Sequence, residues 1–107
     1  MADVILVYER TCPNVRAARA NLVRAFSEAG LPATWREVDR DAADTPSWLR
    51  GFGSPTIVID GEDVGGAPPA DGASCRLYED GGRLVGAPSV ERIAARLRST
   101  RLRPTSR

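Results

Sequence analysis

Cys12 is the residue of this chain best suited to chemistry. It follows the apolar run from Val4 to Tyr8 and precedes Pro13, where an amphipathic helical pattern begins. A cysteine at such a strand-to-helix junction lies near unpaired backbone N–H groups, which favour a negative charge. A thiol in that setting tends to react as the nucleophilic thiolate. Cysteine can also serve as a small buried hydrophobic residue, but the junction favours a reactive thiol.

Few other side chains could assist Cys12. The chain has no histidine and one other cysteine, Cys75. Arg10 and Arg16 flank Cys12, and either could favour the thiolate or bind an anionic group of a substrate. Arg16 could equally be one of several solvated arginines on its helix, because surface charge usually signifies little. Two cysteines without histidine are too few for a structural zinc site.

Strand and helix patterns alternate around Cys12. The run 4–8 is apolar without alternation, as expected of a central strand covered on both faces. A helix is predicted from Pro13, in its first turn, to Gly30, and a second strand over 34–38. A strand–helix–strand unit normally pairs its strands in parallel. The residues expected to form the buried stripe of this helix are Val15, Ala18, Leu22, Ala25, Phe26 and Ala29.

The second half of the chain predicts a short helix, two hairpins and a final helix. The short helix covers 45–50 and a β-branched strand covers 56–59, which Asp60-Gly61 joins to a return strand over 62–64. A smaller hairpin pairs 76–78 with 83–85. Ser89 caps the last helix, whose expected buried residues are Val90, Ile93, Ala94 and Leu97. We expect one domain over 1–98 and a polar, flexible tail over 99–107.

Composition narrows the class of protein. With 107 residues and a formal net charge of +1, the chain predicts a single domain with no bulk electrostatic attraction to nucleic acid or a membrane. All the basic residues are arginine, which indicates a GC-rich, bacterial genome. The chain enters a strand directly, without a charged and then apolar leader, so we expect a cytoplasmic protein.

The order strand–helix–strand–helix–hairpin–helix, with a cysteine opening the first helix, resembles the thioredoxin-like fold. That resemblance covers roughly residues 3–98 and implies an α/β fold with a central mixed sheet flanked by helices. Cys12-Pro13-Asn14-Val15 is similar to the C-x-x-C redox motif, with valine in place of the second cysteine. Ser54-Pro55-Thr56 is similar to the segment that holds a cis-proline facing the active thiol.

A further motif resembles the glutaredoxin branch of this superfamily. Asp60-Gly61 is followed by Val64-Gly65-Gly66, and in glutaredoxins a Gly-Gly after the fourth strand helps to hold a carboxylate of glutathione. The resemblance implies a thiol–disulfide oxidoreductase that acts on a protein disulfide or glutathione. It requires no cofactor, although glutathione could serve as co-substrate. The implied substrate-binding residues are Ser54, Pro55, Thr56, Gly65 and Gly66, with Arg16 as a candidate from its spacing.

The valine in the redox motif leaves the second half of the reaction open. Val15 cannot attack a mixed disulfide, so release of the bound partner needs another thiolate. Cys75 could supply it, because the hairpin at 60–61 should return the chain toward Cys12, or glutathione could do so. Cys75 could equally be a packed residue of a small strand.

Two other functions fit the same residues. A pair of thiolates suits a soft metal ion such as mercury or Cu(I), so the chain could be a metal-binding protein without redox turnover. It could also be a thioredoxin-like domain that has lost catalysis and serves as a docking module. The valine at position 15 is the best argument for the docking module.

Overall fold

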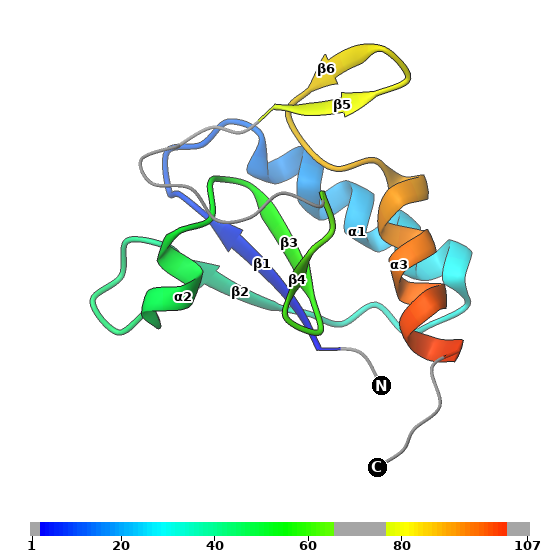
Figure 1. The fold of residues 1–107 in the computed structure, drawn as a ribbon, viewed down its shortest axis with the longest axis horizontal. Helices are drawn as coiled ribbons and strands as arrows, with labels where there is room; N and C mark the ends of the chain where they lie inside the picture. Colours follow the sequence, from blue (N-terminus) through cyan, green and yellow to red (C-terminus); the bar gives the residue numbers. More distant parts are fainter. Residues whose placement is uncertain (1–2, 66–76, 103–107) are drawn as a thin grey trace.

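The structure is a computed structural model that describes residues 3–65 and 77–102 (Figure 1). Its centre is a mixed four-stranded sheet in the order β2-β1-β3-β4. β1 pairs in parallel with β2 and antiparallel with β3, which in turn pairs antiparallel with β4. The strands are β1 (Val4–Tyr8), β2 (Arg36–Asp39), β3 (Thr56–Ile59) and β4 (Glu62–Asp63). The parallel pairing predicted from the strand–helix–strand unit is confirmed.

Helices cover both faces of this sheet, so the protein has an α/β architecture of three layers (Figure 1). Successive side chains of a strand point to opposite faces. Val4 and Leu6 of β1 accordingly pack with α1 (Val15–Ala29) and α3 (Val90–Leu102). Ile5 and Val7 face the opposite side, where α2 (Ser47–Arg50) contributes Leu49 to a smaller cluster. The prediction of a strand buried on both faces is therefore confirmed.

The ends of α1 show which local signals decided its length. The helix begins at Val15, two residues after the predicted start at Pro13, because Asn14 is the residue whose carbonyl accepts the first helical hydrogen bond, from Ala18 N–H at 3.1 Å. At the other end Gly30 adopts a φ of 73°, the left-handed conformation that ends a helix. The predicted stop is confirmed, and every residue of the predicted apolar stripe is buried.

Several other boundaries differ from the predictions. α2 begins at Ser47 rather than at residue 45, and β4 ends at Asp63 rather than at residue 64. β2 begins at Arg36 rather than at residue 34, because its register places Arg36 opposite Ile5. α3 continues to Leu102, past the expected domain boundary at residue 98. The segment 99–102 contains neither glycine nor proline, and the first helix-breaking residue is Pro104. Residues 99–102 are therefore helical rather than part of a tail.

A separate hairpin is formed by β5 (Tyr78–Asp80) and β6 (Arg83–Val85). The predicted hairpin is confirmed, but its turn contains only Gly81 and Gly82, with φ values of 60° and 85°. Glycine is favoured in such a two-residue turn because both positions need a positive φ. Ser89 caps α3 as predicted, since its Oγ accepts a hydrogen bond from Arg92 N–H at 3.1 Å. Within the described parts of the chain, every helix is too short or too polar to cross a bilayer.

Candidate functional site

Cys12 lies in the loop that joins β1 to α1, at the carboxyl end of a central strand. Its backbone N–H donates to the carbonyl oxygen of Glu9 at 3.0 Å, which closes a tight turn before the helix. Its side chain is only 7 % exposed, and its sulfur donates to the carbonyl oxygen of Ser54 at 3.6 Å. The structure thus brings Cys12 together with the segment before β3, as the resemblance implied.

The pairing of β1 with β3 explains why these two segments meet. The strands run antiparallel with Val7 opposite Thr56, so the chain leaving β1 lies beside the chain entering β3. A second contact joins them, because Glu9 N–H donates to Ser54 Oγ at 2.9 Å. The peptide bond between Ser54 and Pro55 is cis, as predicted from the motif.

The side chains of this segment are turned into the protein. Ser54, Pro55 and Thr56 are all buried, and the Thr56 hydroxyl donates to the carbonyl of Gly53 at 2.7 Å. This burial includes their backbone, and the Ser54 carbonyl already accepts the Cys12 S–H. An extended peptide could pair with that carbonyl only in place of the Cys12 S–H.

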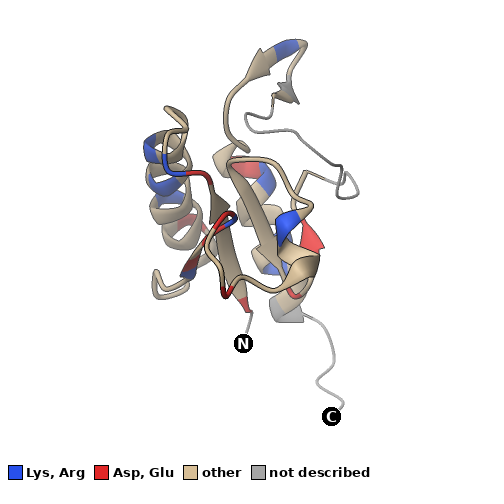
Figure 2. Ribbon diagram, turned by 90° about the vertical axis from the view of Figure 1, so that its left-hand side faces the viewer, with Lys and Arg blue, Asp and Glu red and all other residues tan. Residues whose placement is uncertain are grey.

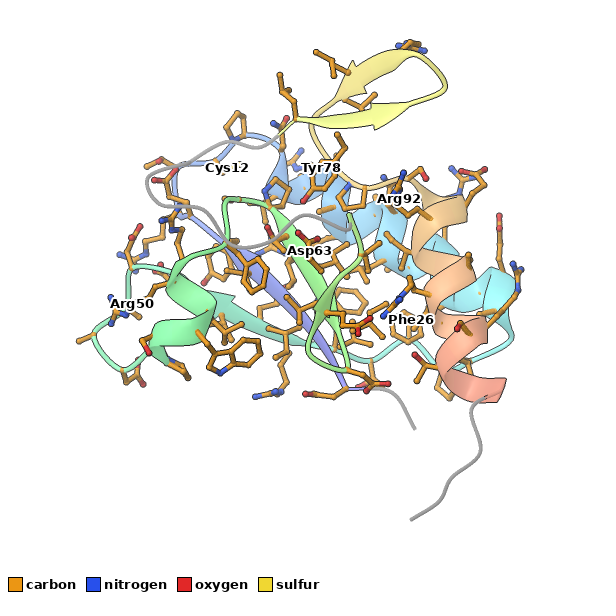
Figure 3. All side chains as sticks on the ribbon, in the orientation of Figure 1. Cys12, Phe26, Arg50, Asp63, Tyr78 and Arg92 are labelled. Atoms are coloured by element: carbon orange, nitrogen blue, oxygen red, sulfur yellow. The ribbon has the colours of Figure 1, made fainter. Side chains whose placement is uncertain are left out.

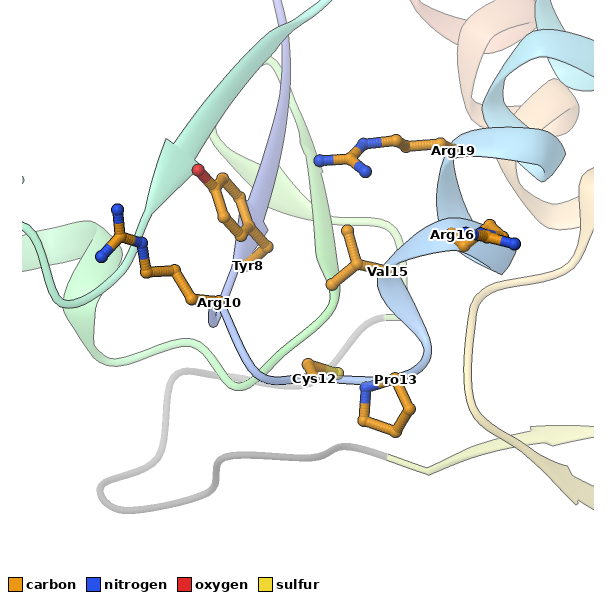
Figure 4. A pocket seen from close by; sticks show the side chains of 7 residues that line it. All are labelled: Tyr8, Arg10, Cys12, Pro13, Val15, Arg16 and Arg19. Carbon is orange, nitrogen blue, oxygen red and sulfur yellow. The ribbon is translucent and has the colours of Figure 1, made fainter.

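A surface pocket of about 480 Å³ adjoins Cys12 (Figure 4). Its walls come from the end of β1, the Cys12 loop and the first turns of α1, and arginines recur along that helix (Figure 2). The sequence had predicted Cys12 and Arg16 for this site and had noted Arg10. The pocket is lined by Tyr8, Arg10, Cys12, Pro13, Val15, Arg16 and Arg19.

The three arginines of the pocket differ in their partners. Arg19 forms two hydrogen bonds with the Glu37 carboxylate, at 2.8 and 2.9 Å, and Arg10 lies 3.5 Å from an oxygen of Asp39. Arg16 makes no ion pair within the described part of the chain, and in Figure 4 its side chain extends away from Cys12. Arg16 is thus the lining cation most available to an anionic molecule.

Glu37 and Arg19 also perturb one another. The hydrogen bond from Arg19 lowers the pKa of the Glu37 carboxyl below its ordinary value, against the opposing effect of burial, and the Trp35 indole N–H adds to the lowering at 3.0 Å. The same hydrogen bond raises the pKa of Arg19. Both groups therefore stay charged at neutral pH, and Arg19 on the wall of the pocket is already paired with a carboxylate outside it.

Sequence reasoning missed Tyr8 and Arg19 as lining residues. The Arg19 guanidinium lies 6.0 Å from the centre of the Tyr8 ring, within range of a cation–π contact. Arg19 follows Val15 by one helical turn, so helical spacing from the Cys12 loop could have indicated it. Tyr8 is the last residue of the central strand and therefore lies next to the same loop.

The glycine motif is only partly described. β4 runs antiparallel to β3, so Gly65 lies toward the end of the sheet at which β3 begins. The N–H of Gly65 donates to Asp63 Oδ1 at 2.8 Å, so this amide is already hydrogen-bonded to a carboxylate of the protein itself. Gly66 and Cys75, the other residues predicted here, lie outside the described residues.

Within residues 3–65 and 77–102, no group of three or more His, Cys, Asp or Glu side chains comes together that could hold a metal ion. The arrangement instead offers one nearly buried thiol, a backbone segment beside it and a basic pocket. Comparison of the chain with protein-family models, curated proteins and solved structures finds no match.

Proposed function

We propose that this protein is a thiol–disulfide oxidoreductase of thioredoxin or glutaredoxin type, with a thioredoxin-like fold and Cys12 as the nucleophile. The observation that carries the proposal is the contact of the Cys12 sulfur with the Ser54 carbonyl, 3.6 Å away and directly before Pro55. The order of the sheet, with β1 and β2 parallel and β3 antiparallel between β1 and β4, supports the fold.

The reaction proceeds by successive exchanges of sulfur bonds. The Cys12 thiolate attacks one sulfur of a disulfide, the sulfur–sulfur bond of that disulfide breaks, and the leaving thiolate takes up a proton. A second thiolate then attacks the Cys12 sulfur of the mixed disulfide and releases the other half of the substrate as a thiol. If Cys75 is the second thiolate, a Cys12–Cys75 disulfide forms, and these two residues lose the two electrons that the substrate gains. If glutathione is the second thiolate, Cys12 is left bonded to glutathione, and a third exchange with a second glutathione releases oxidised glutathione and restores Cys12.

Ser54 would have a different hydrogen-bond partner in each state. In the resting protein its buried carbonyl accepts the S–H of Cys12. Once Cys12 is bonded to a substrate sulfur, that S–H no longer exists and the carbonyl needs another donor. A backbone N–H of the bound partner can supply it, as in the addition of an extended segment to a strand. This exchange would keep the carbonyl paired in the mixed disulfide, as it is in the unreacted protein.

Glutathione is the co-substrate that the pocket suits best. Its two carboxylates match a pocket lined by three arginines, among which Arg16 is available for pairing. Glutathione would also supply the second thiol that Val15 cannot. Cys12 and Arg16 line the same pocket, so one glutathione molecule could contact both residues there.

The test compares two serine variants in a coupled assay of glutathione with a small disulfide, bis(2-hydroxyethyl) disulfide. We expect Cys12→Ser to abolish turnover. Cys75→Ser should remain active if glutathione is the second thiol, whereas accumulation of a mixed disulfide, detected by mass spectrometry, would assign that role to Cys75. Full activity of Cys12→Ser, or no activity of the unmodified protein toward this or a protein disulfide, would refute the proposal.

A non-catalytic docking module is the second candidate, and one observation favours it. Cys12 is only 7 % exposed, which limits the approach of a disulfide to its sulfur. In a docking module the folded protein would leave Cys12 unmodified by iodoacetamide, and unfolding in urea would expose it. Rapid alkylation of the folded protein would support the oxidoreductase instead.

A further inference from the structure

The β5–β6 hairpin stands at the same end of the molecule as Cys12, above the start of α1 (Figures 1 and 3). The sequence predicted strands here without a role in the site. One face of the hairpin is exposed, with Leu77 at 63 % and Leu84 at 68 %. Tyr78 lies on the other face and is only 5 % exposed, so this face is turned into the protein.

Tyr78 ties the hairpin to the segment that faces Cys12. Its hydroxyl donates a buried hydrogen bond to the carbonyl oxygen of Pro55. The ring of a proline fixes φ, so only the ψ torsion of Pro55 separates its own carbonyl from the Ser54–Pro55 peptide plane. Holding the Pro55 carbonyl therefore also holds the carbonyl of Ser54, the group that contacts the Cys12 sulfur.

The other end of the hairpin lies against the residue that precedes α1. Gly86 follows β6 and lies so close to Asn14 that a Cβ atom at this position would be 2.5 Å from Asn14 Nδ2. Asn14 is the N-cap of α1, two residues after Cys12. The hairpin thus contacts the segment before β3 through Tyr78 and the Cys12 loop through Gly86.

We propose that Tyr78 is a positioning residue for Cys12 and acts through the backbone of Pro55 and Ser54. This proposal rests on the proposed function and adds a residue to its site. The hydroxyl holds the Ser54 carbonyl against the Cys12 sulfur in the resting protein and in place for a substrate N–H afterwards. Without the hydroxyl, the carbonyl gains freedom, the sulfur loses its fixed partner and the substrate meets a less ordered acceptor.

The test is Tyr78→Phe, which keeps the buried ring and removes only the hydroxyl. A buried hydrogen bond changes an equilibrium constant by about 2- to 10-fold. We expect Cys12 in this variant to react with iodoacetamide about 2- to 10-fold faster at fixed pH. The KM for a protein disulfide should rise by a similar factor with kcat nearly unchanged. Leu84→Ala, on the exposed face of the same hairpin, is the control and should match the unmodified protein.

Three results separate the explanations. Unchanged alkylation and KM in Tyr78→Phe, with only a lower unfolding temperature, would overturn the proposal, because Tyr78 would then stabilise the fold alone. Equal changes in Leu84→Ala would also overturn it, because they would belong to the whole hairpin. If the proposed oxidoreductase function is wrong, the unmodified protein will show no turnover. The alkylation rates of Cys12 in the variant and in the unmodified protein would still test the role of Tyr78.

A second measurement covers the case in which Tyr78→Phe is too unstable to study in buffer alone. Sucrose is excluded from protein surfaces and favours the folded state, so the alkylation rates of the variant and of the unmodified protein are then compared in sucrose. Faster modification of Cys12 in the variant supports Tyr78 as its positioning residue, and an equal rate contradicts the proposal.

Discussion

Ser54→Ala tests the contact that joins the Cys12 loop to the segment before β3. The Ser54 side chain is fully buried, and its Oγ accepts a 2.9 Å hydrogen bond from Glu9 N–H. Alanine removes this acceptor and leaves the rest of the side chain in place. The substitution therefore isolates one hydrogen bond between two segments that are far apart in the chain.

The expected cost follows from the burial of this bond. A buried donor left without an acceptor costs about 1–3 kcal/mol, and the Glu9 N–H is only partly buried, so we take about 1–2 kcal/mol. In a domain of this size each kcal/mol lowers the unfolding temperature by about 4–8 °C. Ser54→Ala should therefore unfold at least about 4 °C below the unmodified protein.

Urea denaturation and thermal melting, both followed by far-ultraviolet circular dichroism, measure this difference. Ser27→Ala is the matched control, because Ser27 is exposed on α1, where alanine is the better helix former. The control should be as stable as the unmodified protein or slightly more so. Equal stability of Ser54→Ala and Ser27→Ala, within about 0.5 kcal/mol, would refute the view that Ser54 anchors the Cys12 loop.

Three further predictions concern charge. Arg16→Gln should raise the KM for a glutathione disulfide about 2- to 5-fold and leave that for an uncharged disulfide unchanged, as steady-state kinetics would show. Asp63→Ala should lower the same KM, because its carboxylate no longer occupies the Gly65 N–H; an unchanged or higher KM would speak against a glutathione contact there. The lowered pKa of Glu37 stabilises the folded protein at neutral pH. This contribution should disappear as the pH falls below the ordinary pKa of glutamate, and urea midpoints of Arg19→Gln should lack that part of the pH dependence.

Local patterns predicted most of the secondary structure. The apolar stripe of α1, its stop at Gly30 and the Ser89 cap of α3 were all predictable, because each depends on residues within a few positions of one another. β3 was also predicted with its observed bounds, since a β-branched run between turn signals is a local feature. The start of α1 was not predicted correctly. A turn closed by the hydrogen bond from Cys12 N–H to the Glu9 carbonyl precedes the helix, which begins at Val15, two residues later than predicted.

The site was less predictable, because it depends on pairing between distant segments. The sequence named Cys12 and Ser54, but their contact follows from the β1–β3 register. The Arg19–Glu37 pair needs the register of β2 against β1, which residue types alone do not specify. Tyr78 could be identified only once the hairpin was placed beside Pro55.

The position of β1 has a consequence for the order of folding during synthesis. Val4 pairs with Ile59, and Ile5 pairs on its other side with Arg36, so β1 must wait for two partners that follow it in the chain. Pairings between such distant segments slow folding and leave apolar strands open to aggregation in the meantime. We expect β1, α1 and β2 to associate first, with β3 and then α3 completing the core. Substitutions that weaken the β1–β3 pairing should therefore reduce the yield of folded protein during translation.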